Sequence, residues 1–438
     1  MGHTDYHFET KRIHSGYSSE EHFHSVNVPI YQTAAFDLDD IDRARRLWTG
    51  AESGGIYSRV GNPTGAILEE RIRDLDGGSA AVALSSGMAA IAYTILLLGE
   101  GGGNIISTSS LYGAAQESLT HFFPKFGVKT KFVKNRDDIS EYESLIDEHT
   151  KAIYLESISN PNIEIYDFEA IADVAHRHGI LLVVDNTVAT PYLFKPFDHG
   201  ADIIVYSATK GLSGHGNVIA GLVVEKGDFV YSKERFPQFH EKSHKMRDLN
   251  GNPRTPLEFA PTFPFIAQLK IFYLEFIGAI LSPFDAYLAL QGLSTLAERL
   301  DKQIATARKL VTYLENRKEV EWVRHPFATG NPYKALADKY FPNGAGAILS
   351  FGFGGTRQQT KEFIHALNII SYHVNIGDVR TLIANPPETT HSELLPELRE
   401  LAGIPDNLLR ISVGLENADD LIADLDQAFN KVFAEDKK

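Results

Sequence analysis

The chain has 438 residues, of which 43% are hydrophobic and 23% are charged, a composition typical of a globular protein. Its formal net charge of −15 argues against a nucleic acid or an anionic membrane as the main partner, because both require a concentrated basic face. The absence of cysteine excludes disulfides, thiolate metal sites and cysteine nucleophiles, and it agrees with a location in the reducing cytoplasm.

The first part of the chain, residues 1–60, contains many His, Ser, Tyr and Pro residues and shows little sustained periodicity, which predicts an irregular arm. Its five histidines, which include His22 and His24, are scattered, so we predict solvated side chains and no metal site. The first residues lack the apolar core of a secretory signal, and no secretory leader is expected.

One stretch, AAVALSSGMAAIAYTILLL at residues 80–98, carries no charge and is about as long as a membrane span. Ser85, Ser86 and Gly87 interrupt its middle. We therefore predict a buried strand, a tight turn and a buried helix rather than a membrane segment.

Between about Pro63 and Val224, apolar and β-branched stretches alternate with helical patterns. Strands that are apolar on both faces and separated by helices are typical of a mostly parallel sheet covered on both sides. The predicted strands are Ala81–Ser85, Asn104–Thr108, Ala152–Ser157, Ile180–Asp185, Asp202–Ser207 and Val218–Val224. The predicted helices include Ala66–Leu75 and Asp167–Gly179.

The second half of the chain has a different organisation. A region rich in Pro and Gly, from about Phe236 to Pro264, interrupts the alternation, and a long helix is predicted from about Pro283 to Arg317. A strand at Ala345–Phe353 and helices at Gln358–Leu367 and Asp419–Val432 then indicate a smaller α+β domain. The predicted division is an arm (1–60), a large α/β domain (61–285) and a small C-terminal domain (286–438).

A single lysine, Lys210, lies in the segment VYSATKGLSGHG directly after a predicted strand. Sheets of this kind bind ligands at the carboxyl ends of their strands, where Asp185, Ser207 and Thr209 also fall. A lysine amine can form a Schiff base, and pyridoxal phosphate needs such a lysine, a carboxylate for its pyridinium nitrogen and an anion-binding cradle. Lys210 and Asp185 supply the first two.

The cradle for a phosphate is predicted at the start of the helix that follows Ser86. Backbone N–H groups of Gly87 and Met88 would lie at the N-terminus of this helix, where the helix dipole favours an anion. The ring of Tyr112 could stack on the pyridine. The plain alternative is a surface lysine and an unrelated aspartate, but several polar residues at successive strand ends favour a site.

The segment SATKGLSGHGNVIAG resembles the lysine-containing signature of the Cys/Met-metabolism family of pyridoxal-phosphate enzymes, which have the aspartate-aminotransferase-like fold. Further motifs match in order along nearly the whole chain: IYSRVGNPT, ALSSGMAAI, LESISNP, VVDNTVATPYL, LSPFDAYLALQGLSTL, NPPETTHSEL and LLRISVGLEN. Within the family, SPFDAYLALQGL and GDVRTLIANPPETTHSEL are most similar to O-acetylhomoserine sulfhydrylases.

The resemblance implies roles around the cofactor. Lys210 would carry pyridoxal phosphate and move protons, Asp185 would keep the pyridine nitrogen protonated, and Tyr112 would stack on the ring and assist catalysis. Asn160 would bond the phenolic oxygen of the cofactor. The residues implied to hold the phosphate are Gly87, Met88, Ser207 and Thr209.

The resemblance also implies contacts with a second subunit and with the substrate. Tyr57 and Arg59 would complete the phosphate site of a neighbouring subunit, with Tyr57 also near the substrate, so a homo-oligomer is expected, typically a tetramer of two catalytic dimers. Arg410 is similar in placement to the arginine that binds a substrate α-carboxylate, which its planar guanidinium matches. Asn375 would contact the same carboxylate.

Arg380 and His391 belong to family-like segments, but neither receives a role from the resemblance. A surface ion pair is an adequate explanation for Arg380. The chain has YGAA at 112–115, where lyases of the family commonly have a cysteine, and this weakens a methionine γ-lyase interpretation.

The expected reaction is γ-substitution on O-acetyl-L-homoserine with sulfide or a small thiol, which gives L-homocysteine or methionine and acetate. Cystathionine γ-synthase, methionine or cystathionine γ-lyase, and substitution with a carbon or nitrogen nucleophile stay open as alternatives. The glycine-rich motifs of dehydrogenases and P-loop NTPases are missing. A helix-turn-helix or basic arm, as expected of a cofactor-sensing regulator, is missing too.

Overall fold

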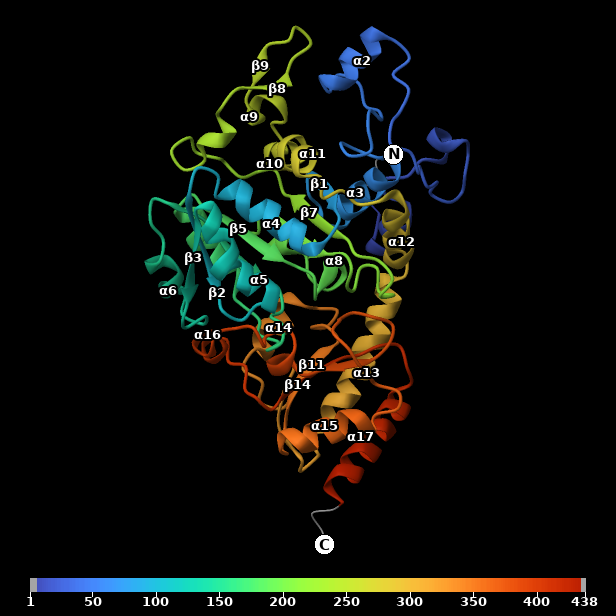
Figure 1. Ribbon diagram of the computed structural model, residues 1–438, viewed down its shortest axis with the longest axis vertical. Coiled ribbons are helices and arrows are strands. Elements are labelled where there is room, and N and C mark those ends of the chain that lie inside the picture. Colours follow the sequence, from blue (N-terminus) through green and yellow to red (C-terminus); the bar gives the residue numbers. More distant parts are fainter. Residues whose placement is uncertain (1–5, 435–438) are drawn as a thin grey trace.

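The computed structural model describes residues 6–434. Figure 1 shows a large domain around a twisted sheet in the middle, a smaller domain below it that ends at the C-terminus, and the N-terminal arm at the top beside a short hairpin. The hairpin consists of β8 (Ser243–Arg247) and β9 (Pro253–Arg254). The two domains and the mostly parallel large sheet agree with the predicted fold class.

The large sheet has seven strands in the order β1-β7-β6-β5-β4-β2-β3. The strands β3, β2, β4, β5 and β6 run parallel, whereas β7 is antiparallel to both β6 and β1. Their bounds are β1 Ala80–Leu84, β2 Gly103–Thr108, β3 Val128–Val133, β4 Thr150–Glu156, β5 Leu181–Asp185, β6 Ile203–Ser207 and β7 Gly221–Glu225.

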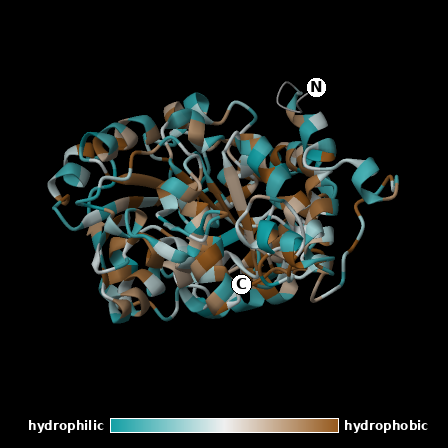
Figure 2. Cartoon of the chain, turned by 90° about the horizontal axis from the view of Figure 1, so that it is seen from above, coloured by the Kyte–Doolittle hydropathy of each residue, from teal (hydrophilic) through white to brown (hydrophobic). Residues whose placement is uncertain are grey.

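Both faces of this sheet are buried, because successive residues of one strand belong to two different cores. Val184 packs in the core that contains α3, α7 and α12, whereas Val183 packs in the core that contains α4. In Figure 2 brown, hydrophobic strands run through the interior, while peripheral helices alternate between brown and teal turns. The continuous apolar strand patterns follow from this double burial.

The helices of the large domain begin at recognisable caps. The Asn62 side chain accepts the backbone N–H of Thr64 and Pro63 takes the first helical position of α3, while Ser86 caps α4. The helices up to the small domain are α1 Phe8–His14, α2 Ile41–Trp48, α3 Pro63–Asp76, α4 Gly87–Leu98, α5 Gly113–Glu117, α6 Ile139–Ser144, α7 Phe168–Arg177, α8 Thr190–Leu193, α9 Pro256–Phe259, α10 Pro264–Gln268, α11 Glu275–Ile277 and α12 Pro283–Leu293. Short 3-10 or π turns are η2 Ser19–His22, η3 Ser118–Phe122, η4 Phe123–Phe126, η5 Pro196–His199, η6 Pro237–Phe239 and η7 Leu269–Leu274.

The small domain has a five-stranded sheet in the order β10-β11-β14-β13-β12, which is antiparallel except for the pair β12 and β13. Its strands are β10 Val320–Arg324, β11 Ile348–Phe353, β12 Ser371–Tyr372, β13 Leu382–Ala384 and β14 Leu408–Ser412. Its helices are α13 Leu296–Glu315, α14 Lys334–Tyr340, α15 Arg357–Ala366, α16 Pro396–Leu401 and α17 Ala418–Phe433, with the turn η8 at Pro386–Glu388.

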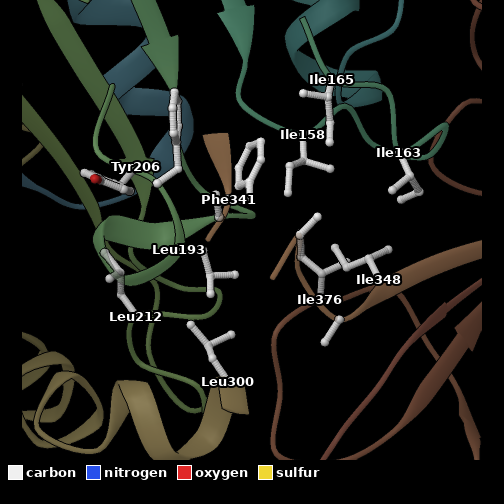
Figure 3. Close-up of a cluster of buried hydrophobic side chains, with 14 of the residues drawn as sticks. Ile158, Ile163, Ile165, Leu193, Tyr206, Leu212, Leu300, Phe341, Ile348 and Ile376 are labelled. Atoms are coloured by element: carbon white, nitrogen blue, oxygen red, sulfur yellow. The ribbon is translucent and has the colours of Figure 1, made fainter. Parts of the chain in front are cut away.

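The two domains share one continuous apolar core. Figure 3 shows Ile158 and Leu193 of the large domain pointing toward Leu300, Ile348 and Ile376 of the small domain, and all of these side chains are buried in the same cluster. Polar groups at the ends of the two sheets are therefore held at fixed positions relative to one another.

Two expectations about helices are wrong. The arm contains the helices α1 and α2, of seven and eight residues; α2 has a local helical signal, because Leu47 is buried on its apolar face and the Asp40 carboxylate caps it by accepting the N–H of Arg43 (2.7 Å). The helix predicted from Pro283 to Arg317 is divided into α12 and α13 after Leu293. At the division the Gly292 carbonyl oxygen accepts the N–H of Thr295 (3.2 Å) and Nη2 of Arg299 (2.8 Å), and a Cβ at Gly292 would lie 2.0 Å from the Ser213 carbonyl oxygen.

Two strand expectations also change. The predicted strand Val218–Val224 starts only at Gly221, because the Thr209 hydroxyl bonds both the N–H (2.9 Å) and the C=O (3.2 Å) of Ala220. The strand β3 is not among the predicted strands; its sequence VKTKFV alternates apolar and polar residues and lacks the continuous apolar run on which those predictions rest. The boundary predicted between residues 285 and 286 falls inside α12 and stays a prediction.

The stretch at 80–98 folds as β1, a turn and α4, as predicted. Across residues 6–434, no helix has the length and apolar character that crossing a bilayer requires.

Candidate active site

A cavity of about 240 Å³ lies where the carboxyl ends of the large-sheet strands meet loops of the small domain. All the predicted site residues except Tyr57 and Arg59 line it: Gly87, Met88, Tyr112, Asn160, Asp185, Ser207, Thr209, Lys210, Asn375 and Arg410. Sequence patterns assign no role to the side chains of four further polar residues that line it, Ser86, Glu156, Thr187 and Thr390.

Lys210 follows β6 and points its amine toward the small domain. Its Nζ donates a hydrogen bond to Asn375 Oδ1 (2.8 Å). Burial, with a smaller contribution from the positive charge of Arg410, lowers the pKa of Lys210 from 10.5 to about 8. A substantial fraction of the amine is therefore neutral near physiological pH, as a nucleophile or base requires.

Two carboxylates lie side by side on adjacent strands. Asp185 ends β5 and Glu156 ends β4, and the two residues are paired in register. The Asp185 carboxylate accepts the N–H of Thr187 (3.0 Å) and the hydroxyl of Tyr154 (3.2 Å). Burial raises the pKa of Asp185; burial and then the Asp185 charge raise the pKa of Glu156. No lysine or arginine among residues 6–434 lowers either pKa, so the pair suits a cationic ligand group.

The N-terminus of α4 forms one end of the cavity. A Cβ at Gly87 would lie 2.5 Å from the Cβ of Ser207, so only glycine lets the end of β6 approach the first turn of the helix. The side chain of Ser86 accepts the N–H of Ala89 (3.1 Å), whereas the N–H groups of the first turn have no partners within the helix. This arrangement favours an anion beside Ser207.

Arg410 lies on β14 and is 2% exposed. Its Nη1 donates to Asn160 Oδ1 (2.7 Å) and its Nη2 to the Asn375 carbonyl oxygen (2.9 Å), while its Nε is buried without a partner in the described part of the chain. Burial lowers the pKa of Arg410 to about 10, so the guanidinium stays protonated at neutral pH. A buried cation with unused donors and only neutral acceptors is suited to a carboxylate ligand.

Tyr112 is the N-cap residue of the short helix α5 and is 37% exposed at the cavity. Its backbone N–H donates to Glu156 Oε1 (2.6 Å), and the N–H of Asn160 donates to Glu156 Oε2 (3.0 Å). The sequence signal that pointed to Asp185, a polar residue at the carboxyl end of a buried strand, could also have pointed to Glu156, because Glu156 ends the neighbouring strand β4.

Tyr57 and Arg59 lie away from the cavity of their own chain. Tyr57 is 43% exposed. The Arg59 guanidinium lies 5.5 Å from the centre of the Tyr57 ring and donates to the backbone oxygen of Glu275.

Arg380 forms an ion pair with Asp378 (3.0 Å) and its side chain is 62% exposed. His22 bonds the Tyr31 hydroxyl (2.8 Å), and residues 6–434 hold no cluster of three or more metal-ligating side chains.

These groups fit pyridoxal phosphate. The glycine-lined helix N-terminus suits its phosphate, the buried carboxylate its pyridinium nitrogen, and the desolvated lysine its aldehyde. Together with the strand order, they define an enzyme of the pyridoxal-phosphate class with the aspartate-aminotransferase-like fold.

The chain belongs to the Cys/Met metabolism PLP-dependent enzyme family, whose model matches residues 9–430. It is 42% identical to the sulfhydrylase FUB7 of Gibberella moniliformis (97% of this chain, 98% of the relative) and 41% identical to the homocysteine synthase of Schizosaccharomyces pombe (96% and 98%). A Campylobacter jejuni structure named as an O-acetylhomoserine (thiol)-lyase, which contains N'-pyridoxyl-lysine-5'-monophosphate, superposes with a TM-score of 0.91 at 36% identity (97% and 100%). Pyridoxal phosphate is thus the cofactor of this chain.

Proposed function

We propose that the protein catalyses γ-substitution on O-acetyl-L-homoserine, in which sulfide or a small thiol replaces acetate to give L-homocysteine or methionine. The main support for this proposal is that the chain is 41–42% identical, over nearly its whole length, to a sulfhydrylase and a homocysteine synthase. The cavity supports it, because it combines a site for a carboxylate, a neutral amine and an anion-binding helix end.

Arg410 would bind the α-carboxylate of the substrate through its unused donors and so turn the Cα–H toward Lys210. The Lys210 amine, whose lowered pKa leaves a substantial fraction neutral near physiological pH, would accept the proton from Cα and assist removal of the proton from Cβ. When bound, pyridoxal phosphate supplies an electron sink for the negative charge that develops at these carbons. Acetate would then leave from Cγ, hydrosulfide would add there, and the Lys210 ammonium would return protons to Cβ and Cα.

Other residues that line the cavity would hold the cofactor in place. Asp185 would bind the protonated pyridine nitrogen, and the Asn160 amide, whose Oδ1 is held by Arg410, would direct its N–H toward the phenolic oxygen. Tyr112 would cover one face of the ring and orient the leaving group. Ser207 and the first turn of α4, with Met88 and the Thr209 loop, would bind the phosphate.

The proposal is tested with purified, cofactor-loaded protein, O-acetyl-L-homoserine and sulfide. Stoichiometric homocysteine and acetate support it. Ammonia and 2-oxobutyrate, formed without homocysteine, would instead show a γ-lyase. A comparison of acetyl, succinyl and phospho esters, each with sulfide and with cysteine, separates the sulfhydrylase from a cystathionine γ-synthase.

We also propose that two copies of the chain form each catalytic unit, as part of a tetramer, with Tyr57 and Arg59 reaching the phosphate site of the partner. Their exposure and their distance from the cavity of their own chain support this proposal. Mixing inactive Lys210→Ala and Arg59→Ala subunits should restore part of the activity, since one of the two mixed sites is intact. No recovery in mixed oligomers would contradict a shared site.

We propose the cytoplasm as its location, in agreement with a sequence that has no cysteine. Fractionation of cells that express the native protein, followed by detection with an antibody, tests this proposal.

A further inference from the structure

One peptide unit next to the cavity is held from both of its polar sides. The N–H of Tyr112 donates to Glu156 Oε1 (2.6 Å), and the C=O of Leu111 accepts from His391 Nε2 (3.1 Å). These two groups belong to the same planar peptide. Two hydrogen bonds in opposite directions therefore fix the rotation of that plane, and with it the direction in which the Tyr112 side chain leaves the backbone.

The protonation of His391 agrees with this contact. The imidazole is 1% exposed, and its Nδ1 lies 2.8 Å from the hydroxyl of Thr390. Burial lowers the pKa of His391 to about 4, so the ring is neutral at physiological pH and carries one N–H. With that N–H on Nε2 it donates to Leu111, and Nδ1 accepts from Thr390.

The two side chains come from different domains. Glu156 ends β4 of the large sheet, where its second oxygen also holds the N–H of Asn160 (3.0 Å). His391 follows η8 in the small domain. A Cβ at Gly113 would lie 1.9 Å from the Thr390 carbonyl oxygen, so the small-domain loop rests directly on the turn that begins α5.

We propose that Glu156 and His391 are a pair of positioning residues that direct the Tyr112 ring onto the cofactor. Because His391 belongs to the small domain, the orientation of the ring depends on the position of the small domain against the large one. The inference rests on the proposed function, in that it assumes the cofactor and substrate positions given above. It assigns a role to His391, for which the sequence supplied none.

The test compares Glu156→Gln, His391→Phe and their double variant in the cofactor-loaded enzyme. Glutamine offers one acceptor oxygen instead of two, so at least one backbone N–H loses its bond, and phenylalanine keeps a planar ring without a donor. We expect kcat to fall about 10- to 100-fold in each single variant with little change in KM, because displacing a reacting group by about 1 Å costs this much. The visible circular dichroism of the bound cofactor should weaken in parallel.

His391→Gln is the conservative variant, since its amide nitrogen can take the place of Nε2 and donate to Leu111. It should recover most of the kcat and of the dichroism that His391→Phe loses. The double variant should lose less than the product of the two single losses, since both act on one peptide.

The chain offers matched controls. Glu225 is a buried glutamate that accepts the N–H groups of Phe265 (3.2 Å) and Ile266 (2.9 Å) at the opposite end of the sheet. His325 is a fully buried histidine that accepts the N–H of Phe327 (3.1 Å). Glu225→Gln and His325→Phe should lower the melting temperature and leave kcat and the dichroism unchanged.

The proposal is overturned if the Glu156 and His391 variants behave like these controls, with a loss of melting temperature only, or if His391→Gln recovers nothing. The dichroism needs no turnover. If the protein makes no homocysteine yet its cofactor signal responds as expected, the proposed function fails while the positioning role stands.

Discussion

The two sheets contribute to the site in different ways. The large, mostly parallel sheet supplies groups at the ends of consecutive strands, such as Asp185 at the end of β5 and Ser207 at the end of β6, and in the proposed function these surround the cofactor. The small antiparallel sheet supplies Arg410 from within a strand, and Asn375 and His391 from loops. We therefore assign cofactor chemistry to the large domain and substrate binding to the small one. Variants of the cofactor-binding residues in the large domain should mainly lower turnover, whereas variants of the substrate-binding residues in the small domain should mainly lower kcat/KM.

The largest effect is expected at Lys210. Under the proposed function, Lys210→Ala would remove both the group that attaches the cofactor and the base, and should lower turnover by about 10³-fold or more. Borohydride reduction of the loaded wild-type enzyme should label this side chain, as peptide mass mapping can show. Lys151, a buried lysine near the start of β4, donates to the carbonyl oxygen of Arg235, and Lys151→Ala should retain activity. Equal losses in both variants would contradict the assignment.

The next largest effect is expected in the small domain, at Arg410. Arg410→Ala should lower kcat/KM by about 10²-fold, as expected for the loss of a buried charge-assisted bond to a carboxylate, while the melting temperature changes little. Arg299 is the comparison: it is also buried, but it donates to the carbonyl oxygens of Gly211 (2.9 Å), Leu212 (3.2 Å) and Gly292 (2.8 Å). Arg299→Ala should therefore destabilise the fold. Equal destabilisation by the two variants would make Arg410 a structural residue.

A third effect concerns the pH at which the apoprotein takes up its cofactor. The neutral amine of Lys210 is the reactive form, and its pKa is lowered to about 8. The uptake rate should rise about tenfold per pH unit below pH 8 and level off above it, whereas an ordinary lysine would level off only above its usual pKa. Stopped-flow absorbance measures this profile. In Arg410→Ala the profile should move to higher pH, since a nearby positive charge is gone.

The smallest effect is on stability in acid. Burial lowers the pKa of His325 to about 4, below its unfolded value of 6.5. The unfolded chain therefore binds a proton first as the pH falls, and stability is lost between about pH 6.5 and 4, by up to about 3 kcal/mol. Urea unfolding at pH 7 and pH 5 measures the loss, which His325→Phe should reduce. An unchanged pH dependence in this variant would contradict the prediction.

The fold was largely predictable where burial leaves a local pattern. The strands β4, β5 and β6 are buried on both faces, and each contains a run of four apolar residues in sequence. The division of the helix after Leu293 was not predictable, because Ser294 and Thr295 are tolerated in helices and the close contact of Gly292 with Ser213 comes from another part of the chain.

The sequence by itself determined the chemistry of this protein. A lysine, a carboxylate and a small-residue helix start follow apolar strands, and parallel strands bring such ends to one edge of a sheet. Only the tertiary structure decided which partners these groups meet. Arg410 reaches Asn160 across 250 positions and Lys210 reaches Asn375 across 165, and the peptide before Tyr112 is held by Glu156 and His391. Local patterns record burial and backbone period, whereas contacts between domains come from packing and leave no periodic signal in either segment.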